Sequence, residues 1–300
     1  MRLLYLGLPL GALMLHREGF ALTGACIARP LMPGMRRLRR ILAATQSPLL
    51  GRPDLTQPEV QQLLASTRPD LVVSWFWTRR IPPEVLRAAP GGGVNVHPSL
   101  LPRYRGPDPY FWTLLHGDTE TGVTVHRITS QYDEGPILLQ RSVTVPADLD
   151  AWQLARRLDL PSLQCLRDAL CALRDGTLSP AGTPQDDTRA TLAPRPTDDD
   201  CELRWTDPVD RVLRRIRAAS PEPGAFTAYD DQTVVVLRAV PSSWSGRGFD
   251  PGDMVLTPAG VTVVCADGAL VLDAARAEDS DLVLRGTAIA ALFPGLAALE

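Results

Sequence analysis

The chain has 300 residues, of which 45% are hydrophobic, and its formal net charge is −3. This composition is typical of a globular protein of one or two domains and excludes a fibrous or disordered chain. All 31 basic residues are arginine, which excludes a Schiff-base lysine and a P-loop lysine. Nucleic-acid binding would need a local basic patch, because the chain as a whole is slightly acidic.

Five widely spaced cysteines without a CxxC pair predict neither a disulfide framework nor a zinc site, and we expect no metal. This pattern fits a reducing compartment, so we expect a cytoplasmic protein. The apolar run 3–15 could belong to a signal peptide, but Gly7, Pro9 and Gly11 interrupt it. We therefore interpret the run as a buried strand leading into a helix, and we expect no membrane span.

The first half of the chain alternates short apolar runs with helical patterns, which is typical of βαβ units around a mostly parallel sheet. Strands are predicted at 3–6, 22–28, 71–75, 94–97, 123–128 and 137–145. Helices are predicted at 58–66, 85–89, 110–116 and 151–174. We therefore expect a Rossmann-like α/β domain at residues 1–178.

The second half changes character, because residues 176–206 are rich in Pro, Thr, Gly and Asp and resemble a linker. An arginine-rich amphipathic helix is predicted at 209–218. Short strands separated by glycine turns follow at 233–240, 253–256, 261–265 and 270–274. This spacing fits a small β-barrel or a sandwich, and we expect an OB-like β-barrel. The predicted boundaries are a linker at 179–203 and a β-barrel-like domain at 204–300.

Two polar residues mark the end of the strand 94–97. Asn95, the only asparagine of the chain, and His97 are two residues apart, so their side chains lie on one face of the strand. Pro98 follows and cannot continue a central ladder. The pair therefore lies at the carboxyl end of a strand, where open α/β sheets bind ligands. A structural histidine is the alternative interpretation of His97.

A polar loop at 130–135 joins two apolar strands and contains Asp133, which locally could also be a simple turn residue. The remaining histidines, His16, His116 and His126, have no comparable neighbours, and we interpret them as structural or surface residues. Arg103, Tyr104 and Arg105 could bind an anion or form surface salt bridges.

The segment Val94-Asn95-Val96-His97-Pro98-Ser99-Leu100-Leu101-Pro102-Arg103-Tyr104-Arg105-Gly106 resembles the core motif of the folate-dependent formyltransferase family. The segments 121–125 and 132–135 resemble the second motif of that family. A weaker resemblance covers the first 90 residues. The last hundred resemble the C-terminal domain of methionyl-tRNA and sugar N-formyltransferases, through 216–218 and 221–226.

The resemblance implies a transfer of the formyl group of 10-formyltetrahydrofolate to a primary amine. It implies that Asn95 donates a hydrogen bond to the formyl oxygen and that His97, protonated or poised to be, stabilises the oxyanion. Asp133 would raise the basicity of His97 and help to remove the amine proton. The residues implied to line the carrier pocket are Trp75, Trp77, Ser99, Leu100, Leu101 and Pro102. Those expected near the acceptor amine are Arg103, Tyr104, Arg105, Asp108 and Tyr110.

The acceptor is the open question. Methionyl-tRNA formyltransferases contact tRNA with a Gly-, Arg- and Lys-rich loop, and residues 29–40 of this chain are basic but shorter than that loop. Residues 107–112 contain aromatic side chains and resemble the corresponding segment of amine and sugar formyltransferases. Residues 203–300 hold nine arginines and thirteen acidic residues, which disfavours phosphate binding. We therefore prefer a small-molecule amine, such as an amino sugar, over Met-tRNA.

Three further alternatives remain. A formyltetrahydrofolate hydrolase would use the same three residues with water as the acceptor. A binding module without catalysis predicts that Asn95 and His97 can be replaced without loss of function. A Rossmann dehydrogenase is disfavoured, because no GxGxxG motif follows the first strand.

Overall fold

The computed structural model describes residues 1–299, and the chain forms two compact units. The first unit comprises residues 1–107, 120–144 and 157–192. The second comprises 108–119, 145–156 and the chain from 193 onward. Each unit has its own sheet.

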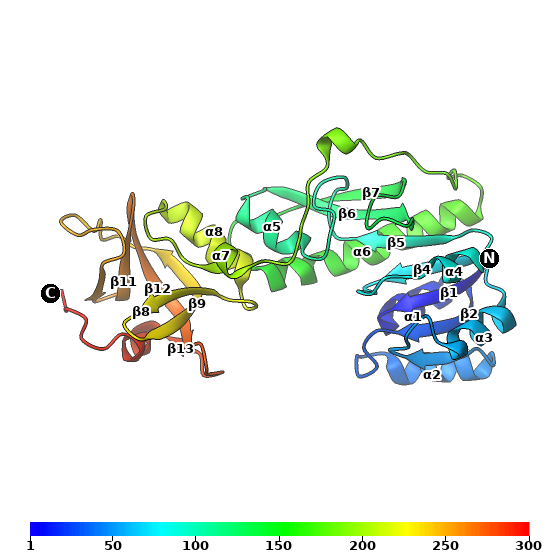
Figure 1. Ribbon diagram of the computed structural model, residues 1–300, viewed down its shortest axis with the longest axis horizontal. Coiled ribbons are helices and arrows are strands. Elements are labelled where there is room, and N and C mark those ends of the chain that lie inside the picture. Colours follow the sequence, from blue (N-terminus) through cyan, green and yellow to red (C-terminus); the bar gives the residue numbers. More distant parts are fainter. Residues whose placement is uncertain (300) are drawn as a thin grey trace. The chain divides into compact units, whose positions relative to one another are not determined.

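The first unit is built on a seven-stranded sheet in the order β3-β2-β1-β4-β5-β6-β7 (Figure 1). Its strands are β1 (Arg2–Gly7), β2 (Ala21–Ile27), β3 (Leu49–Gly51), β4 (Leu71–Trp75), β5 (Gly93–His97), β6 (Glu120–Arg127) and β7 (Ile137–Thr144). The strands β1 to β5 are parallel, whereas β6 runs antiparallel to β5 and β7 antiparallel to β6. The carboxyl end of β5 therefore lies beside a β-hairpin, and this junction positions the candidate site.

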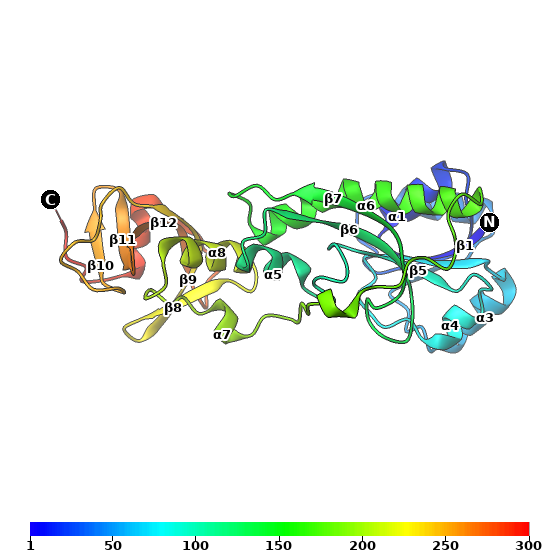
Figure 2. The same ribbon diagram turned by 90° about the horizontal axis from the view of Figure 1, so that it is seen from above.

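The helices of this unit cover both faces of the sheet. They are α1 (Pro9–Arg17), α2 (Met35–Ala44), α3 (Pro58–Thr67), α4 (Pro83–Arg87) and, from residue 157 onward, α6 (Ala151–Arg174), with a 3-10 turn η1 (Asp187–Arg189). Figure 2 shows α1 and α6 on one face and α3 and α4 on the other. Proline occupies the first turn of α1, α3 and α4, where its missing N–H costs no hydrogen bond.

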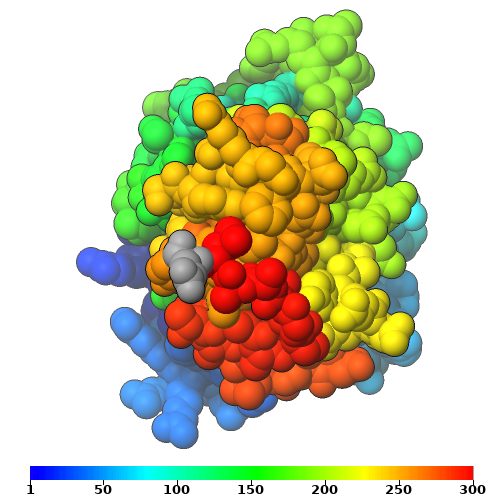
Figure 3. Space-filling model, turned by 90° about the vertical axis from the view of Figure 1, so that its left-hand side faces the viewer, coloured from blue at the N-terminus to red at the C-terminus, as the bar shows by residue number. Residues whose placement is uncertain are grey.

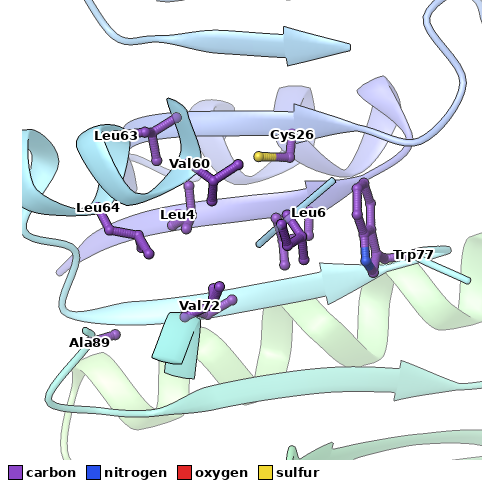
Figure 4. Close-up of a cluster of buried hydrophobic side chains, with 11 residues drawn as sticks. Leu4, Leu6, Cys26, Val60, Leu63, Leu64, Val72, Trp77 and Ala89 are labelled. Carbon is purple, nitrogen blue, oxygen red and sulfur yellow. The ribbon is translucent and has the colours of Figure 1, made fainter. Parts of the chain in front are cut away.

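The alternation along β1 divides the core between the two faces. Leu4 and Leu6 are fully buried and join a cluster with Val60, Leu63 and Val72 under α3 (Figure 4). Tyr5 points to the opposite face. A Cβ atom added at Gly11 of α1 would lie 2.3 Å from the Tyr5 hydroxyl, so α1 can pack this closely only because residue 11 is glycine. Parallel strands buried on both faces explain the continuous apolar runs in the sequence.

The second unit combines helices with an antiparallel sheet in the order β10-β11-β12-β9-β8, with β13 beside β12. Its strands are β8 (Ala225–Tyr229), β9 (Gln232–Pro241), β10 (Met254–Thr257), β11 (Gly260–Cys265), β12 (Gly268–Ala277) and β13 (Leu284–Arg285). Its helices are α5 (Pro109–Leu115), α7 (Asp198–Cys201), α8 (Val209–Ala219) and the 3-10 helix η2 (Gly286–Leu292). Figure 3 views this unit with β10 and β11 in orange and η2 in red.

The predicted fold class is confirmed as a mostly parallel α/β unit followed by an antiparallel β domain. The strand 71–75 and the helix 151–174 have the predicted bounds. The strands β3 and β8 and the helix α2 were not predicted. Strand β3 has only three residues, which is too short for a recognisable apolar pattern. Helix α2 follows a proline-containing turn, so its first residue is difficult to locate from the sequence. The predicted boundaries at 178 and 203 stay a prediction. No helix of the described chain is long and apolar enough to cross a membrane.

Candidate active site

The pairing of β5 with β6 brings an amide and two imidazoles together. Asn95 lies opposite His126 in the antiparallel ladder, and His97 lies opposite Thr124. Because side chains alternate along a strand, all four point to one face of the sheet. The Asn95 Nδ2 atom lies 3.3 Å from His126 Nε2, and the rings of His97 and His126 are nearly perpendicular, with centroids 6.5 Å apart.

Asp133 joins this group from the loop between β6 and β7. Its Oδ2 atom lies 3.5 Å from His97 Nδ1, and its Oδ1 atom lies 3.5 Å from His126 Nε2. The backbone N–H of Gly106 donates to Oδ2 at 3.0 Å. Asp133 has a φ of +57°, a conformation that Asp tolerates better than bulkier residues do. The structure therefore brings the three predicted catalytic residues into one cluster.

His126, for which the sequence predicts a structural or surface role, belongs to this cluster. It is 2% exposed and contacts both Asn95 and Asp133. The alternation along 123–128 already separates His126 from Val125. Its place beside Asn95 depends on the register between two strands, which the sequence pattern does not give.

The tautomer of the His126 ring follows from its contacts. Its Nδ1 lies 2.9 Å from the Arg127 carbonyl oxygen, which can only accept a hydrogen bond, so Nδ1 carries a hydrogen. In the neutral ring Nε2 is then an acceptor and receives the amide N–H of Asn95. That contact fixes which end of the Asn95 side chain is the donor and leaves its second N–H for a ligand.

His97 is held between two oxygens. Its Nε2 lies 2.7 Å from the Tyr104 carbonyl, and its Nδ1 faces Asp133. Burial of the ring lowers the pKa of His97 below 6.5, and the Asp133 carboxylate opposes this shift without reversing it. The expected influence of Asp133 is therefore present, but burial outweighs it. The ring is mostly neutral at pH 7 and gains a proton more readily when further negative charge faces it.

Asp133 remains ionised although it is largely buried. Burial alone raises the pKa of its carboxyl group, but the electrostatic influence of the His97 and His126 rings and the hydrogen bond from the Gly106 N–H outweigh burial and lower the pKa. A carboxylate beside two imidazoles can accept a proton through either ring. The cluster therefore combines the neutral amide donor of Asn95, the titratable ring of His97 and the negative charge of the Asp133 carboxylate.

The residues predicted to line the carrier pocket follow β5 directly. Ser99 is fully buried, and its hydroxyl donates to the Arg103 carbonyl at 2.6 Å. Leu101 is held by its backbone, with its N–H donating to Thr124 Oγ1 and its carbonyl accepting from Gln140. Leu100 packs where Gly122 lacks a side chain, and Pro102 is half-buried. These contacts make the segment 99–102 a rigid wall beside His97.

The two predicted tryptophans have different environments. Trp75 is buried, and its Nε1 donates to Ser162 of α6 at 2.8 Å. Trp77 lies near the carboxyl ends of β1 and β4 (Figure 4), and its buried Nε1 has no acceptor among the described residues. A buried N–H without an acceptor is costly and suits a site that a ligand completes.

The predicted acceptor residues are divided between the two units. Arg103 is exposed and stacks on the Tyr104 ring, with its guanidinium carbon 4.8 Å from the ring centroid. Arg105 is only 8% exposed and pairs with Asp187 at 2.7 Å. Asp108 and Tyr110 belong to the second unit, at the start of α5, and burial raises the pKa of the Asp108 carboxyl. Arg105 is therefore a buried structural cation in this structure.

Two protein-family models match the chain. The model described as formyl transferase matches residues 39–170, and the model described as formyl transferase, C-terminal domain, matches residues 196–284. The first match includes the whole cluster of Asn95, His97, His126 and Asp133. The second includes α8 and the strands β8 to β12.

Curated relatives match nearly the full length. The methionyl-tRNA formyltransferase of Syntrophus aciditrophicus is 34% identical over 289 residues, which cover 92% of this chain and 91% of the relative. That of Anaeromyxobacter dehalogenans strain 2CP-1 is 35% identical over 285 residues, which cover 91% of this chain and 90% of the relative.

Among solved structures, HypX from Aquifex aeolicus in complex with tetrahydrofolic acid superposes with a TM-score of 0.68 and 21% identity. The match covers all of this chain and 48% of HypX, so this chain spans about half the length of that protein. At this identity the likeness concerns the fold.

Proposed function

Because the chain belongs to the formyltransferase family and is a folate-dependent formyltransferase enzyme, we propose that it transfers the formyl group of 10-formyltetrahydrofolate to the amino group of methionyl-tRNA. The observation that carries the chemical step is the cluster of Asn95, His97 and Asp133. The acceptor rests on the relatives, which resemble this chain along both units.

The relatives favour Met-tRNA over the small-molecule amine that the sequence alone favoured. That preference rested on the acidic C-terminal region and on the short basic segment after the second strand. Similarity along about nine-tenths of both chains weighs more than either local feature. A small amine remains as a comparison substrate for the test.

A basic surface on α2 also supports an RNA substrate. Residues 19–53 contain six arginines and no Asp or Glu. Arg36, Arg37, Arg39 and Arg40 lie on α2 and are all exposed, and none forms an ion pair within residues 1–299. Unpaired arginines on one helix gain free energy when they neutralise phosphates.

The residues near β4 and β5 fit a flat heteroaromatic carrier. The Trp77 N–H lacks an acceptor among the described residues, and ring nitrogens or a ring carbonyl of a pterin would supply one. Ser99 and Leu101 use their polar groups internally, so the segment 99–102 offers apolar contact and a fixed shape. The carrier supplies the activated formyl group, and the residues of this chain bind and orient it.

Asn95 and His97 then stabilise charge at the formyl oxygen. The free N–H of Asn95 donates to that oxygen, with its orientation set by His126. As the amine attacks the carbonyl carbon, negative charge on the oxygen favours protonation of the nearby His97 ring. One such donor is worth about 3–4 kcal/mol of the barrier.

Asp133 removes the proton of the attacking amine. The carboxylate stays ionised, so it can accept that proton directly or through water or an imidazole. When the carbon–nitrogen bond to the carrier breaks, the same proton can pass to the departing nitrogen. The cycle then ends with neutral products and the cluster in its starting state.

The test is a comparison of acceptors with 10-formyltetrahydrofolate, following release of tetrahydrofolate and the formylated product. We expect Met-tRNA to give a kcat/KM far above that of any small amine or amino sugar. A comparable rate with a small amine would reject the tRNA assignment, and release of tetrahydrofolate without a formylated product would indicate a hydrolase.

Substitutions test the chemical step. Asn95→Ala and His97→Ala should each lower kcat by about a hundredfold or more, because each removes one group that stabilises charge at the formyl oxygen. Unchanged kcat in both variants would reject the assigned roles and would favour a binding module. Circular dichroism of each variant checks that the fold is retained.

A further inference from the structure

An extended segment forms hydrogen bonds with two parts of the chain near the candidate site, the loop after β5 and the start of β7. We call residues 183–192 the strap. At its start, Thr183 exchanges two backbone hydrogen bonds with Ile137, both 2.8 Å long. At its end, Thr191 donates its N–H to Pro102 and accepts the N–H of Arg105 at 2.9 Å. The strap therefore contacts the loop after β5 and the start of β7.

Gln185 lies near the start of the strap, and its side-chain amide makes four hydrogen bonds. Its Oε1 accepts from Arg105 Nε at 3.0 Å and from Nη2 at 2.8 Å. Its Nε2 donates to the Asp133 carbonyl at 2.7 Å and to the Gly135 carbonyl at 2.8 Å. An amide has two acceptor sites and two donor hydrogens, so every polar site of Gln185 is used.

These four bonds join the supports of His97 and Asp133. Arg105 follows Tyr104, whose carbonyl accepts from His97, and precedes Gly106, whose N–H donates to the Asp133 carboxylate. On the other side, Gln185 holds the backbone carbonyl of Asp133 itself. The Gln185 side chain thus connects the loop that contacts His97 with the loop that contains Asp133.

The charge of the side chain matters as much as its length. The Arg105 guanidinium is nearly buried, and its carboxylate partners Asp187 and Glu134 are 83% and 49% exposed. A glutamate at position 185 would satisfy Arg105, but it would turn negative oxygens toward two carbonyls. Only a neutral amide offers acceptors on one side and donors on the other.

We propose that Gln185 is a positioning residue for formyl transfer, which acts by holding the loop of Asp133 against the loop of Arg105 so that the carboxylate faces His97. This inference rests on the proposed function, because it assigns Gln185 an effect only through His97 and Asp133.

The experiment compares Gln185→Met, Gln185→Glu and Asp133→Asn with the native protein, with steady-state kinetics on saturating carrier and acceptor. Gln185→Met keeps the length and removes all four hydrogen bonds, whereas Gln185→Glu keeps only the acceptors. We expect kcat to fall by about a hundredfold in both, as for a displacement of about 1 Å, with KM nearly unchanged.

The pH profile separates positioning from loss of stability. Asp133 opposes the effect of burial on His97, so a displaced carboxylate should move the profile of kcat toward lower pH. The double variant Gln185→Met with Asp133→Asn should be no slower than Asp133→Asn alone, because both changes act on one group. Gln232→Met is the matched control, since Gln232 donates to the Leu292 carbonyl at 2.7 Å in the other unit.

Gln185→Met with native kcat and a native pH profile would overturn this inference while leaving the catalytic roles intact. Rate reductions that multiply in the double variant would also overturn it. Full activity of Asp133→Asn would reject the proposed role of Asp133, and the inference with it.

Discussion

Helices α2 and α8 carry similar arginine-rich sequences in different electrostatic surroundings. In α2 the buried residues are Leu38 and Leu42, and its four arginines are exposed without acidic partners among the described residues. In α8, Arg211 and Arg215 pair with Asp207, and Arg214 pairs with Asp210. The fourth arginine of α8, Arg217, donates to the Ala147 carbonyl.

A count of arginines therefore does not by itself identify a nucleic-acid surface. Two carboxylates, Asp207 and Asp210, already pair with three arginines of α8, so phosphates would have to compete with them. The segment around α2 has no acidic residue between Glu18 and Asp54, and its charge is therefore available to a partner. Four predictions test this contrast.

The largest effect is expected from reversing the charge of α2. Replacing Arg36, Arg37, Arg39 and Arg40 with Glu should lower kcat/KM for Met-tRNA by about a thousandfold, because attraction to phosphates becomes repulsion. The rate with a small amine should stay unchanged, which serves as the control in the same kinetic assay. An equal reduction with both acceptors would show that α2 acts on the fold rather than on RNA.

The next effect is a loss of stability in α8. Arg215 is 6% exposed, pairs with Asp207 at 3.0 Å and donates to the Asp200 carbonyl at 3.2 Å. Arg215→Ala should lower the free energy of unfolding by about 3 kcal/mol, since it leaves a poorly exposed carboxylate short of a partner. Urea denaturation measures the change. A stability unchanged within error would contradict the structural role given to this arginine.

Salt dependence gives a smaller and more specific effect. The logarithm of 1/KM for Met-tRNA should fall linearly with the logarithm of salt concentration, as expected when cations are released from phosphates. Replacing Arg36 and Arg37 with Ser should reduce this slope by roughly 0.7–0.9 for each phosphate that the native arginines neutralise. Titrations in chloride at constant pH give the slope, and a variant with the native slope would place the RNA elsewhere.

The smallest effect is expected at the exposed end of α8. Arg211 is 63% exposed and lies 3.3 Å from Asp207, one helical turn away. Arg211→Ala should change the free energy of unfolding by no more than about 0.5 kcal/mol and leave the KM for Met-tRNA unaltered. If this KM rose as much as it does in the α2 variants, α8 would contribute to RNA binding as α2 does, and the proposed difference between the two helices would be wrong.

Much of the first unit could be predicted because its strands are buried on both faces. Continuous apolar runs such as 71–75 and the strong periodicity of 151–174 locate elements without tertiary information. The motif around Asn95 and His97 likewise indicated a site at a strand end. Strand β3 could not be predicted, because three residues carry too little pattern to be distinguished from a loop.

The residues missed in the site depend on pairings between distant segments. His126 comes beside Asn95 through the register of β5 and β6, and Gln185 reaches Asp133 from 52 residues away. Arg105 resembles a surface cation in the sequence, yet the strap buries it. Local patterns contain no information on such pairings.

Apolar periodicity and the motif at 94–106 are local properties, so the sequence alone predicts the class of fold and places Asn95 and His97 at the end of a strand. The tertiary structure shows which imidazole contacts Asn95, in which direction the pKa of His97 moves, and which arginines of α8 pair with carboxylates. Desolvation and hydrogen bonding depend on neighbours from other segments, and only the folded chain provides them.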